Sequence, residues 1–196
     1  MAKRAAEVTR ETAETQVSVK LHLDGTGEAE IQTGIGFFDH MLNLLAAHGQ
    51  FDLSVVCNGD LEVDGHHTVE DIGITLGMAF AEALGTKEGI NRYGTFFLPM
   101  DESLVLVSLD FSGRPILVYD GGEMAPMVGA FDTELCEEFF RAFAVHAGLT
   151  LHVKVLYGKN THHKIEGIFK GLGHALRIAV SHDPRVHGIP STKGVL

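Results

Sequence analysis

The sequence predicts an α/β (α+β) protein made of two pseudo-repeated halves, each a mostly antiparallel sheet with two helices packed on one face. The first observation is a repeated motif, H-H-x-x-E, at 66–70 and 162–166, which lie 96 positions apart in a chain of 196 residues. The second is that each half ends in the order helix, strand, helix after a strand-rich region. Repetition at half the chain length indicates duplication, so we expect half-domains at 1–93 and 94–196 that form one compact unit.

The composition is that of a globular protein with a hydrophobic core. The hydrophobic content is 45%, and the net charge of −11 argues against nucleic acid or an anionic membrane as a partner. The first residues contain no apolar segment typical of a signal peptide, and no apolar run reaches membrane-spanning length. The two cysteines, Cys57 and Cys136, form no C-x-x-C pattern. We therefore expect a cytoplasmic protein that binds neither nucleic acid nor membranes.

The first half is expected to begin with a β-hairpin. Alternating apolar residues over 17–23 predict a half-buried strand, and 28–32 is interpreted as its hairpin partner across a glycine-containing turn. The apolar stripe over 37–47 predicts a helix, which is followed by a strand over 51–56. The first H-H-x-x-E motif then opens a helix that ends near Leu84, where Gly85 supplies a stop signal.

The second half repeats this order after a strand-rich region. Strands are predicted over 95–98, 104–109 and 115–119. A helix is expected to open at 131–133, capped by Asp132 or Thr133, and to end near residue 145. A strand over 149–156 precedes the second H-H-x-x-E helix, which is expected to end near residue 180.

The spacing within the repeated motif favours a site for two metal ions. Adjacent histidines on a helix point about 100° apart, so they suit two ions better than one. We expect His67 and Glu70, which share a helix face, to hold one ion. Asp71 could replace Glu70, but Gly167 occupies that position in the second copy, so the repeat favours Glu70. By the same reasoning His163 and Glu166 would hold the second ion. The preceding histidines, His66 and His162, would each reach across to the other ion.

His40 and Glu138 are candidates for a fourth protein ligand to each ion. His40 and His48 lie eight positions apart, and so do Glu138 and His146, 98 positions later in both cases. The duplication therefore extends beyond the motif. Glu138 can also be interpreted as a solvated carboxylate on a helix face. A site made of nitrogen and oxygen ligands suits Mn, Fe, Ni or Zn.

Three long blocks and the end of the chain resemble a known family. The blocks GIGFFDHMLNLLAAHG (34–49), DGHHTVEDIGITLG (64–77) and THHKIEGIFKGLGHALR (161–177), with PSTKG (190–194), resemble imidazoleglycerol-phosphate dehydratase. The resemblance covers the chain from about Glu7 to Leu196 and implies a ribosomal protein S5 domain 2-like fold. It also implies a hydro-lyase of L-histidine biosynthesis that dehydrates D-erythro-imidazoleglycerol phosphate to imidazole acetol phosphate.

The same resemblance implies a dinuclear manganese site and a large assembly. Two Mn²⁺ ions per active site would stabilise an imidazolate and then a diazafulvene-like intermediate, because a nearby cation favours the anionic ring. The expected assembly is a homo-oligomer of 24 subunits with sites between subunits, and the expected partner is a small phosphorylated imidazole. Several members of the family carry His where this chain has Glu138, although a carboxylate also suits manganese.

The resemblance assigns further residues to catalysis and to the substrate. Glu14 is expected to contact the substrate and is the candidate base, the alternative being a polar residue at a strand start. His48 either contacts the substrate or is a hydrogen-bonded structural histidine. The phosphate needs cations, and the residues expected to hold it are Arg92, Arg114, Lys170, Ser191 and Lys193. The residues assigned to catalysis are Glu14, His40, His66, His67, Glu70, His162, His163 and Glu166.

Two other functions would use the same metal ligands. A dinuclear metallohydrolase acting on a phosphate ester would place its attacking water between the ions. A non-enzymatic metal-binding protein would have no use for the arginines and the Ser-Thr-Lys tail. Phosphate-binding residues that converge on the metals would distinguish either enzyme from the binding protein. Imidazole binding to the metals would distinguish the dehydratase from the hydrolase.

Overall fold

A computed structural model describes residues 4–196 of the chain. The first half contains β1 (Ala5–Glu11), β2 (Thr15–His22), β3 (Ala29–Gln32), α1 (Gly36–Gly49), β4 (Asp52–Gly59) and α2 (His66–Leu84). The second half contains β5 (Tyr93–Met100), β6 (Ser103–Asp110), β7 (Ile116–Asp120), β8 (Met127–Val128), β9 (Phe131–Asp132), α3 (Leu135–Ala147), β10 (Thr150–Tyr157) and α4 (Thr161–Val180). None of the helices within residues 4–196 is both long enough and apolar enough to cross a membrane.

The two halves have the same sheet topology. The strand order is β1-β2-β4-β3 in one four-stranded sheet and β5-β6-β10-β7 in the other. In each sheet the last pair, β3 with β4 or β7 with β10, is parallel, and the remaining pairs are antiparallel. The predicted fold class, two pseudo-repeated halves with mostly antiparallel sheets, is therefore confirmed.

The predicted hairpin between 17–23 and 28–32 is wrong. β3 pairs with β4 in parallel, with Ala29 opposite Leu53, and makes no ladder with β2. Both sides of β2 are taken by β1 and β4, and β1 was not predicted from the sequence. The turn after β2 is instead fastened to the start of β4, because Asp52 accepts hydrogen bonds from the backbone N–H groups of Thr26 and Glu28. After β2 the chain therefore passes the place that β4 occupies in the sheet and forms β3 on its far side.

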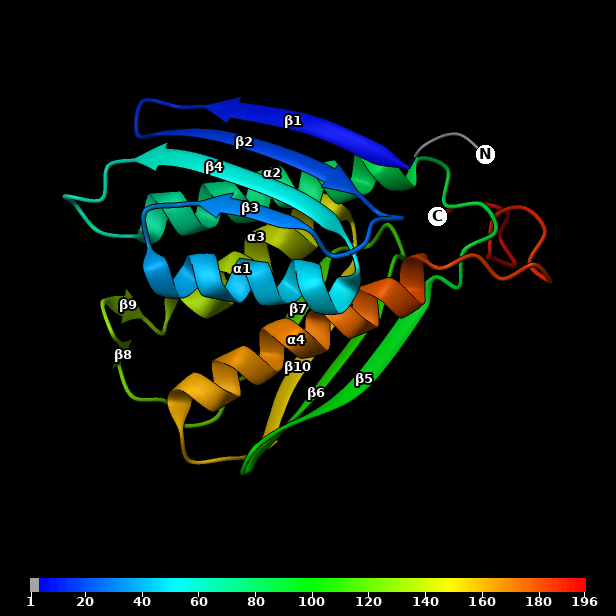
Figure 1. Ribbon diagram of the computed structural model, residues 1–196. Helices are drawn as coiled ribbons and strands as arrows, with labels where there is room; N and C mark the ends of the chain where they lie inside the picture. The colour runs from blue at the N-terminus through cyan, green and yellow to red at the C-terminus, as the bar shows by residue number, and fades with distance from the viewer. Residues whose placement is uncertain (1–3) are drawn as a thin grey trace.

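The four helices lie between the two sheets, as Figure 1 shows. α1 packs on α4 and α2 packs on α3, so each half contributes one layer of helices to a shared core. Fully buried phenylalanines join the halves: the ring of Phe38 lies 5.3 Å from that of Phe139 and 6.3 Å from that of Phe169. One continuous core therefore fixes the relative position of the two H-H-x-x-E helices.

The two motif helices begin and end close to where the sequence predicts. α2 begins at His66 and is followed by Gly85, and α4 ends at Val180. α3 begins at Leu135, later than predicted, because residues 131–132 form β9 and pair with β8. Asp132 accepts a hydrogen bond from the backbone N–H of Glu134, whereas the Thr133 hydroxyl donates to the carbonyl of Ala125.

Glycines allow α2 and α3 to approach closely, and an alanine there is expected to destabilise the protein. A Cβ on Gly77 would lie 2.7 Å from the carbonyl oxygen of Phe143 and 2.9 Å from the backbone nitrogen of Ala147. Gly77→Ala must push backbone apart, so we expect a loss of about 1–3 kcal/mol in the free energy of unfolding. Thermal unfolding measures this loss. Gly36→Ala is the matched control, because a Cβ there meets no atom within 4 Å; equal stability of the two variants would contradict the close approach.

Candidate functional site

Side chains from α1 and α4 converge close to the N-terminal end of α4. Within residues 4–196, His40, His162 and Glu166 offer ligand atoms that all lie within 4.8 Å of one another. The Oε2 atom of Glu166 lies 2.9 Å from Nε2 of His162 and 3.5 Å from Nε2 of His40. Metal–ligand bonds of roughly 2.1 Å place ligands at right angles about 3 Å apart. The cluster therefore fits three ligands on one face of a metal ion.

The carboxylate of Glu166 is held in its charged form. Its other oxygen, Oε1, lies 2.5 Å from Nζ of Lys170, one helical turn further along α4. Burial acts to raise the pKa of Glu166, but the hydrogen bonds from Lys170 and His162 outweigh it, and the net pKa is lowered. The carboxylate is thus ready to take a cation at neutral pH without first losing a proton.

The first motif forms a similar arrangement with α3. Nε2 of His66 lies 3.9 Å from Oε2 of Glu70, four positions later on α2. His66 and Glu138 line the same cavity of about 790 Å³, where α3 faces the start of α2. Glu138 occupies the position in α3 that His40 occupies in α1. The structure therefore presents two related groups, and each combines residues of both halves: His40 of α1 with His162 and Glu166 of α4, and Glu138 of α3 with His66 and Glu70 of α2.

The second histidine of each motif turns away from the glutamate of its own motif. Nδ1 of His67 lies 3.0 Å from Asp60, and Nδ1 of His163 lies 2.7 Å from Glu102. These hydrogen bonds raise the pKa of both imidazoles. Loop carboxylates thus hold the second histidine, while the first histidine lies beside the glutamate at i,i+4 spacing. The expectation that His67 with Glu70, and His163 with Glu166, each hold an ion stays a prediction.

Asp60 and Glu102 are not among the site residues predicted from the sequence. Asp60 follows β4 directly, and Glu102 precedes β6 directly. A signal was nevertheless available for Glu102, because Glu14 occupies the same place before β2 in the first half. A comparison of the two turns would have indicated that both glutamates lie beside a motif.

Glu14 lies next to the first motif, in the turn between β1 and β2. Its Oε2 atom is 3.7 Å from Nε2 of His67, and its side chain is 54% exposed. His48 lies elsewhere, between α1 and α4, where its Nδ1 atom is 3.2 Å from Nε2 of His174. Burial and the nearby charge of Lys170 lower the pKa of His48. Glu14 is therefore open to a ligand, whereas His48 has a hydrogen-bond partner within the chain.

The residues expected to hold phosphate fall into two separate groups. Arg92 pairs with Asp110 at 2.6 Å and donates to the carbonyl of Pro190, which brings the tail with Ser191 and Lys193 to the start of β5. Arg114 lies at the same end of the sheet, in the turn before β7. Lys170 instead contacts Met100, at the far end of β5. Seven residue steps along a strand correspond to about 23 Å, so the two groups do not converge within one chain.

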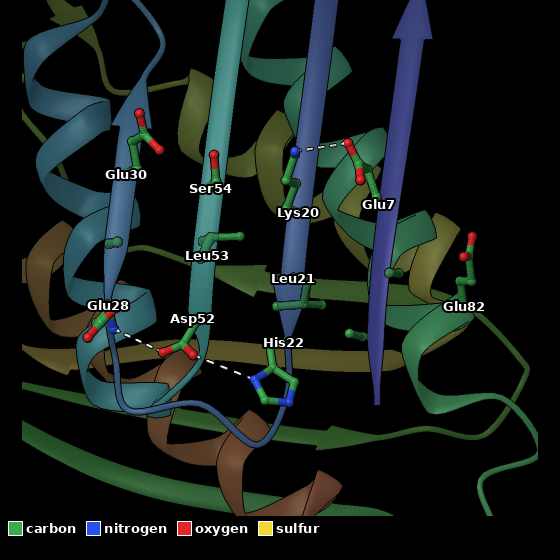
Figure 2. Close-up of a pocket in the computed structure, with 13 residues that line it drawn as sticks. Glu7, Lys20, Leu21, His22, Glu28, Glu30, Asp52, Leu53, Ser54 and Glu82 are labelled. Carbon is green, nitrogen blue, oxygen red and sulfur yellow. Dashed lines mark hydrogen bonds and ion pairs between the residues drawn. The ribbon is translucent and has the colours of Figure 1, made fainter. Parts of the chain in front are cut away.

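A hollow on the outer face of the first sheet contains none of the predicted site residues. Its volume is about 720 Å³, and strands β1 to β4 line it on the side away from the helices. Figure 2 shows its ion pairs, Lys20 with Glu7 at 3.1 Å and His22 with Asp52 at 3.5 Å. The candidate site therefore lies at the helix N-termini and not on this face.

Comparison with known proteins identifies the family. The sequence profile described as imidazoleglycerol-phosphate dehydratase matches residues 33–176, which include both motifs. The chain is 62% identical over 193 residues to the imidazoleglycerol-phosphate dehydratase of Caldanaerobacter subterraneus subsp. tengcongensis, a match that covers 98% of this chain and 100% of that protein. The chain belongs to the imidazoleglycerol-phosphate dehydratase family. The resemblance noted from the sequence is thus confirmed, and with it a hydro-lyase of histidine biosynthesis.

Solved structures of imidazoleglycerol-phosphate dehydratases share the fold. The enzyme from Staphylococcus aureus is 41% identical, with a TM-score of 0.83 over 91% of this chain and 99% of that one. The enzyme from Pyrococcus furiosus is 39% identical, with a TM-score of 0.83 over 96% of this chain and 99% of that one. The likeness extends over nearly the whole chain, so the arrangement of two halves is a property of this dehydratase family.

Proposed function

We propose that this protein dehydrates D-erythro-imidazoleglycerol phosphate to imidazole acetol phosphate at a dinuclear manganese site in the cytoplasm. The observation that carries the proposal is the convergence of His40, His162 and Glu166 in a chain of the dehydratase family. Two imidazole nitrogens and a carboxylate oxygen suit Mn²⁺. The second ion would be held by His66, Glu70 and Glu138. In a reducing cytoplasm the thiols of the chain remain free, as they are here.

The residues around the clusters have separate tasks in this proposal. Bound cations would favour the deprotonated imidazole ring of the substrate, because a nearby positive charge stabilises the anion. Lys170 keeps Glu166 charged and fixes its orientation. Glu14, exposed beside His67, would accept the proton lost from the substrate's side chain. Arg92, Arg114, Ser191 and Lys193 would hold the phosphate.

We propose further that active sites form between subunits of a 24-mer. The separation of Lys170 from Arg92 and the tail supports this, because one chain alone does not bring metal ligands and phosphate ligands together. Exposed apolar side chains on the outer face of the sheet β5-β6-β10-β7 support association as well, since such side chains often mark interfaces. They lie on its two edge strands, with Tyr93 and Phe97 on β5 and Ile116 and Val118 on β7.

Removal of the metal is expected to abolish turnover. The purified protein is stripped with a chelator, assayed with imidazoleglycerol phosphate, and assayed again after Mn²⁺ is added, while sedimentation reports its assembly. We expect the ketone product only with metal. Release of inorganic phosphate without ketone would support the metallohydrolase instead. Stoichiometric metal uptake without any turnover by the assembled protein would support a binding protein.

A further inference from the structure

A buried carboxylate fastens the turn that carries Glu14. Asp71, on α2, is only 6% exposed. Its Oδ1 atom accepts a hydrogen bond from Nε of Arg10 at 2.8 Å, and its Oδ2 atom accepts one from the hydroxyl of Thr15. Arg10 lies on β1, and Thr15 is the first residue of β2, directly after Glu14. Asp71 therefore ties both strands of the hairpin to the helix that carries the first motif.

The hydrogen bonds continue from Thr15 to the backbone of Glu14. The hydroxyls of Thr12 and Thr15 are 3.1 Å apart, and Oγ1 of Thr12 accepts hydrogen bonds from the backbone N–H groups of Glu14 and Thr15. On the other side, the carbonyl of Glu14 accepts a hydrogen bond from the N–H of Asp60. The backbone of Glu14 is thus fixed from both directions, while its carboxylate stays exposed beside His67.

In the second half the corresponding hairpin, β5 and β6, packs on α4 without a pair like that of Arg10 and Asp71. Gly167 stands where the first half has Asp71, and a Cβ on it would lie 3.0 Å from Val105 and 3.7 Å from Leu98. Both of those side chains are buried. Buried ion pairs often add no net stability over apolar side chains of similar volume. The second half therefore shows that the fold can form this contact without a buried carboxylate.

The two turn glutamates also differ in what they bind. Glu102, the counterpart of Glu14, accepts hydrogen bonds from the backbone of Lys159 and Asn160 and lies 2.7 Å from Nδ1 of His163. Its carboxylate is occupied with holding the loop before α4. The polar network around Asp71 thus occurs in the half whose turn glutamate is the more exposed of the two, at 54% against 39%, and does not hold a neighbouring loop.

We infer that Asp71 is a positioning residue, which fixes the β1–β2 turn so that the Glu14 carboxylate is held within reach of the substrate beside His67. The inference rests on the proposed function, in which Glu14 takes a proton. Proton transfer requires hydrogen-bond reach, and a misplacement of about 1 Å can lower a rate by about 100-fold. Asp71 then acts only through Glu14 and not on the metal or the phosphate.

A double-mutant cycle tests this dependence. We expect Asp71→Asn to lower kcat by about 10-fold or more, with KM and manganese content unchanged. In a Glu14→Gln background the same substitution is expected to lower kcat by less than about twofold, because the group it positions is already lost. A merely structural role would lower kcat equally in both backgrounds, and that result would overturn the inference.

Matched variants separate positioning from stability. Arg10→Lys keeps the charge opposite Asp71 and is expected to retain most of kcat. Asp24→Asn breaks the ion pair with Arg4 at the opposite end of the same hairpin and is expected to leave kcat unchanged. If Asp71→Asn fails to fold by circular dichroism, the double variant Arg10→Leu, Asp71→Gly imitates the apolar contact of the second half and is expected to fold with the same loss of kcat.

The outcomes distinguish this inference from the proposed function. Ketone production by the wild type, together with an unchanged kcat in folded Asp71 variants, would overturn the inference alone. A metal-loaded wild type that produces no ketone would overturn the proposed function and the inference with it.

Discussion

Glu166→Gln is expected to abolish most turnover and to remove one of the two metal ions. Oε2 of Glu166 lies 3.5 Å from Nε2 of His40 and 2.9 Å from Nε2 of His162, and Oε1 is paired with Lys170. Glutamine has nearly the same shape but no charge, so the two imidazoles lose the anion between them. Residues that merely support metal ligands contribute about 10–100-fold to affinity or activity. We therefore expect a direct ligand to contribute at least about 100-fold to kcat/KM.

Elemental analysis and the turnover assay measure this effect together. Glu7→Gln is the matched control, because Glu7 is an exposed glutamate that pairs with Lys20 at 3.1 Å on the outer face of the first sheet. The control is expected to keep its metal and its activity. A Glu166→Gln protein with full metal content and wild-type turnover would remove the cluster of His40, His162 and Glu166 from the proposed site.

Glu14→Gln is expected to lower kcat by about 10²–10⁴-fold, the usual contribution of a general base. KM and metal content are expected to stay close to those of the wild type, because Glu14 belongs to neither cluster. The thermal unfolding temperature is also expected to stay unchanged, since the hydrogen bonds of Glu14 are made by its backbone and its side chain is exposed. Loss of kcat without loss of stability or metal would support the role of base.

Glu11→Gln provides the control for this second substitution. Glu11 lies at the end of β1 on the same hairpin and accepts a hydrogen bond from the side chain of Gln16. Its replacement is expected to change kcat by less than about twofold, as for most exposed polar groups. If Glu14→Gln also changed kcat by so little, another group would have to be the base.

Local signals in the sequence were sufficient for most of the helices. The motif helices were predicted within about two residues, because their apolar periodicity and the stop at Gly85 are properties of a few neighbouring residues. α3 begins later than predicted, because Phe131 and Asp132 pair with β8. The predicted partner of β3 is wrong for another reason, since its true partner β4 lies beyond α1 in the chain.

The repeat also predicted which positions correspond between the halves. The offset that relates His40 to Glu138 follows from the sequence alone. The structure places His40 with His162 and Glu166, and it places Glu138 in the cavity with His66. Their roles as metal ligands remain proposals, but the grouping agrees with the duplication.

The sequence by itself determined that this protein is a duplicated α/β dehydratase-family chain with two histidine-rich helices. Only the tertiary structure decided which histidine of each pair faces the glutamate. Neighbouring histidines on a helix differ by about 100°, and three-residue and four-residue spacings both allow contact with a glutamate. Asp60 and Glu102 determine which histidine it is, because they hold the second histidines from loops that lie beside the motif helices only in the folded protein. The distance between Arg92 and Lys170 was decided in the same way, because the length of β5 keeps them apart.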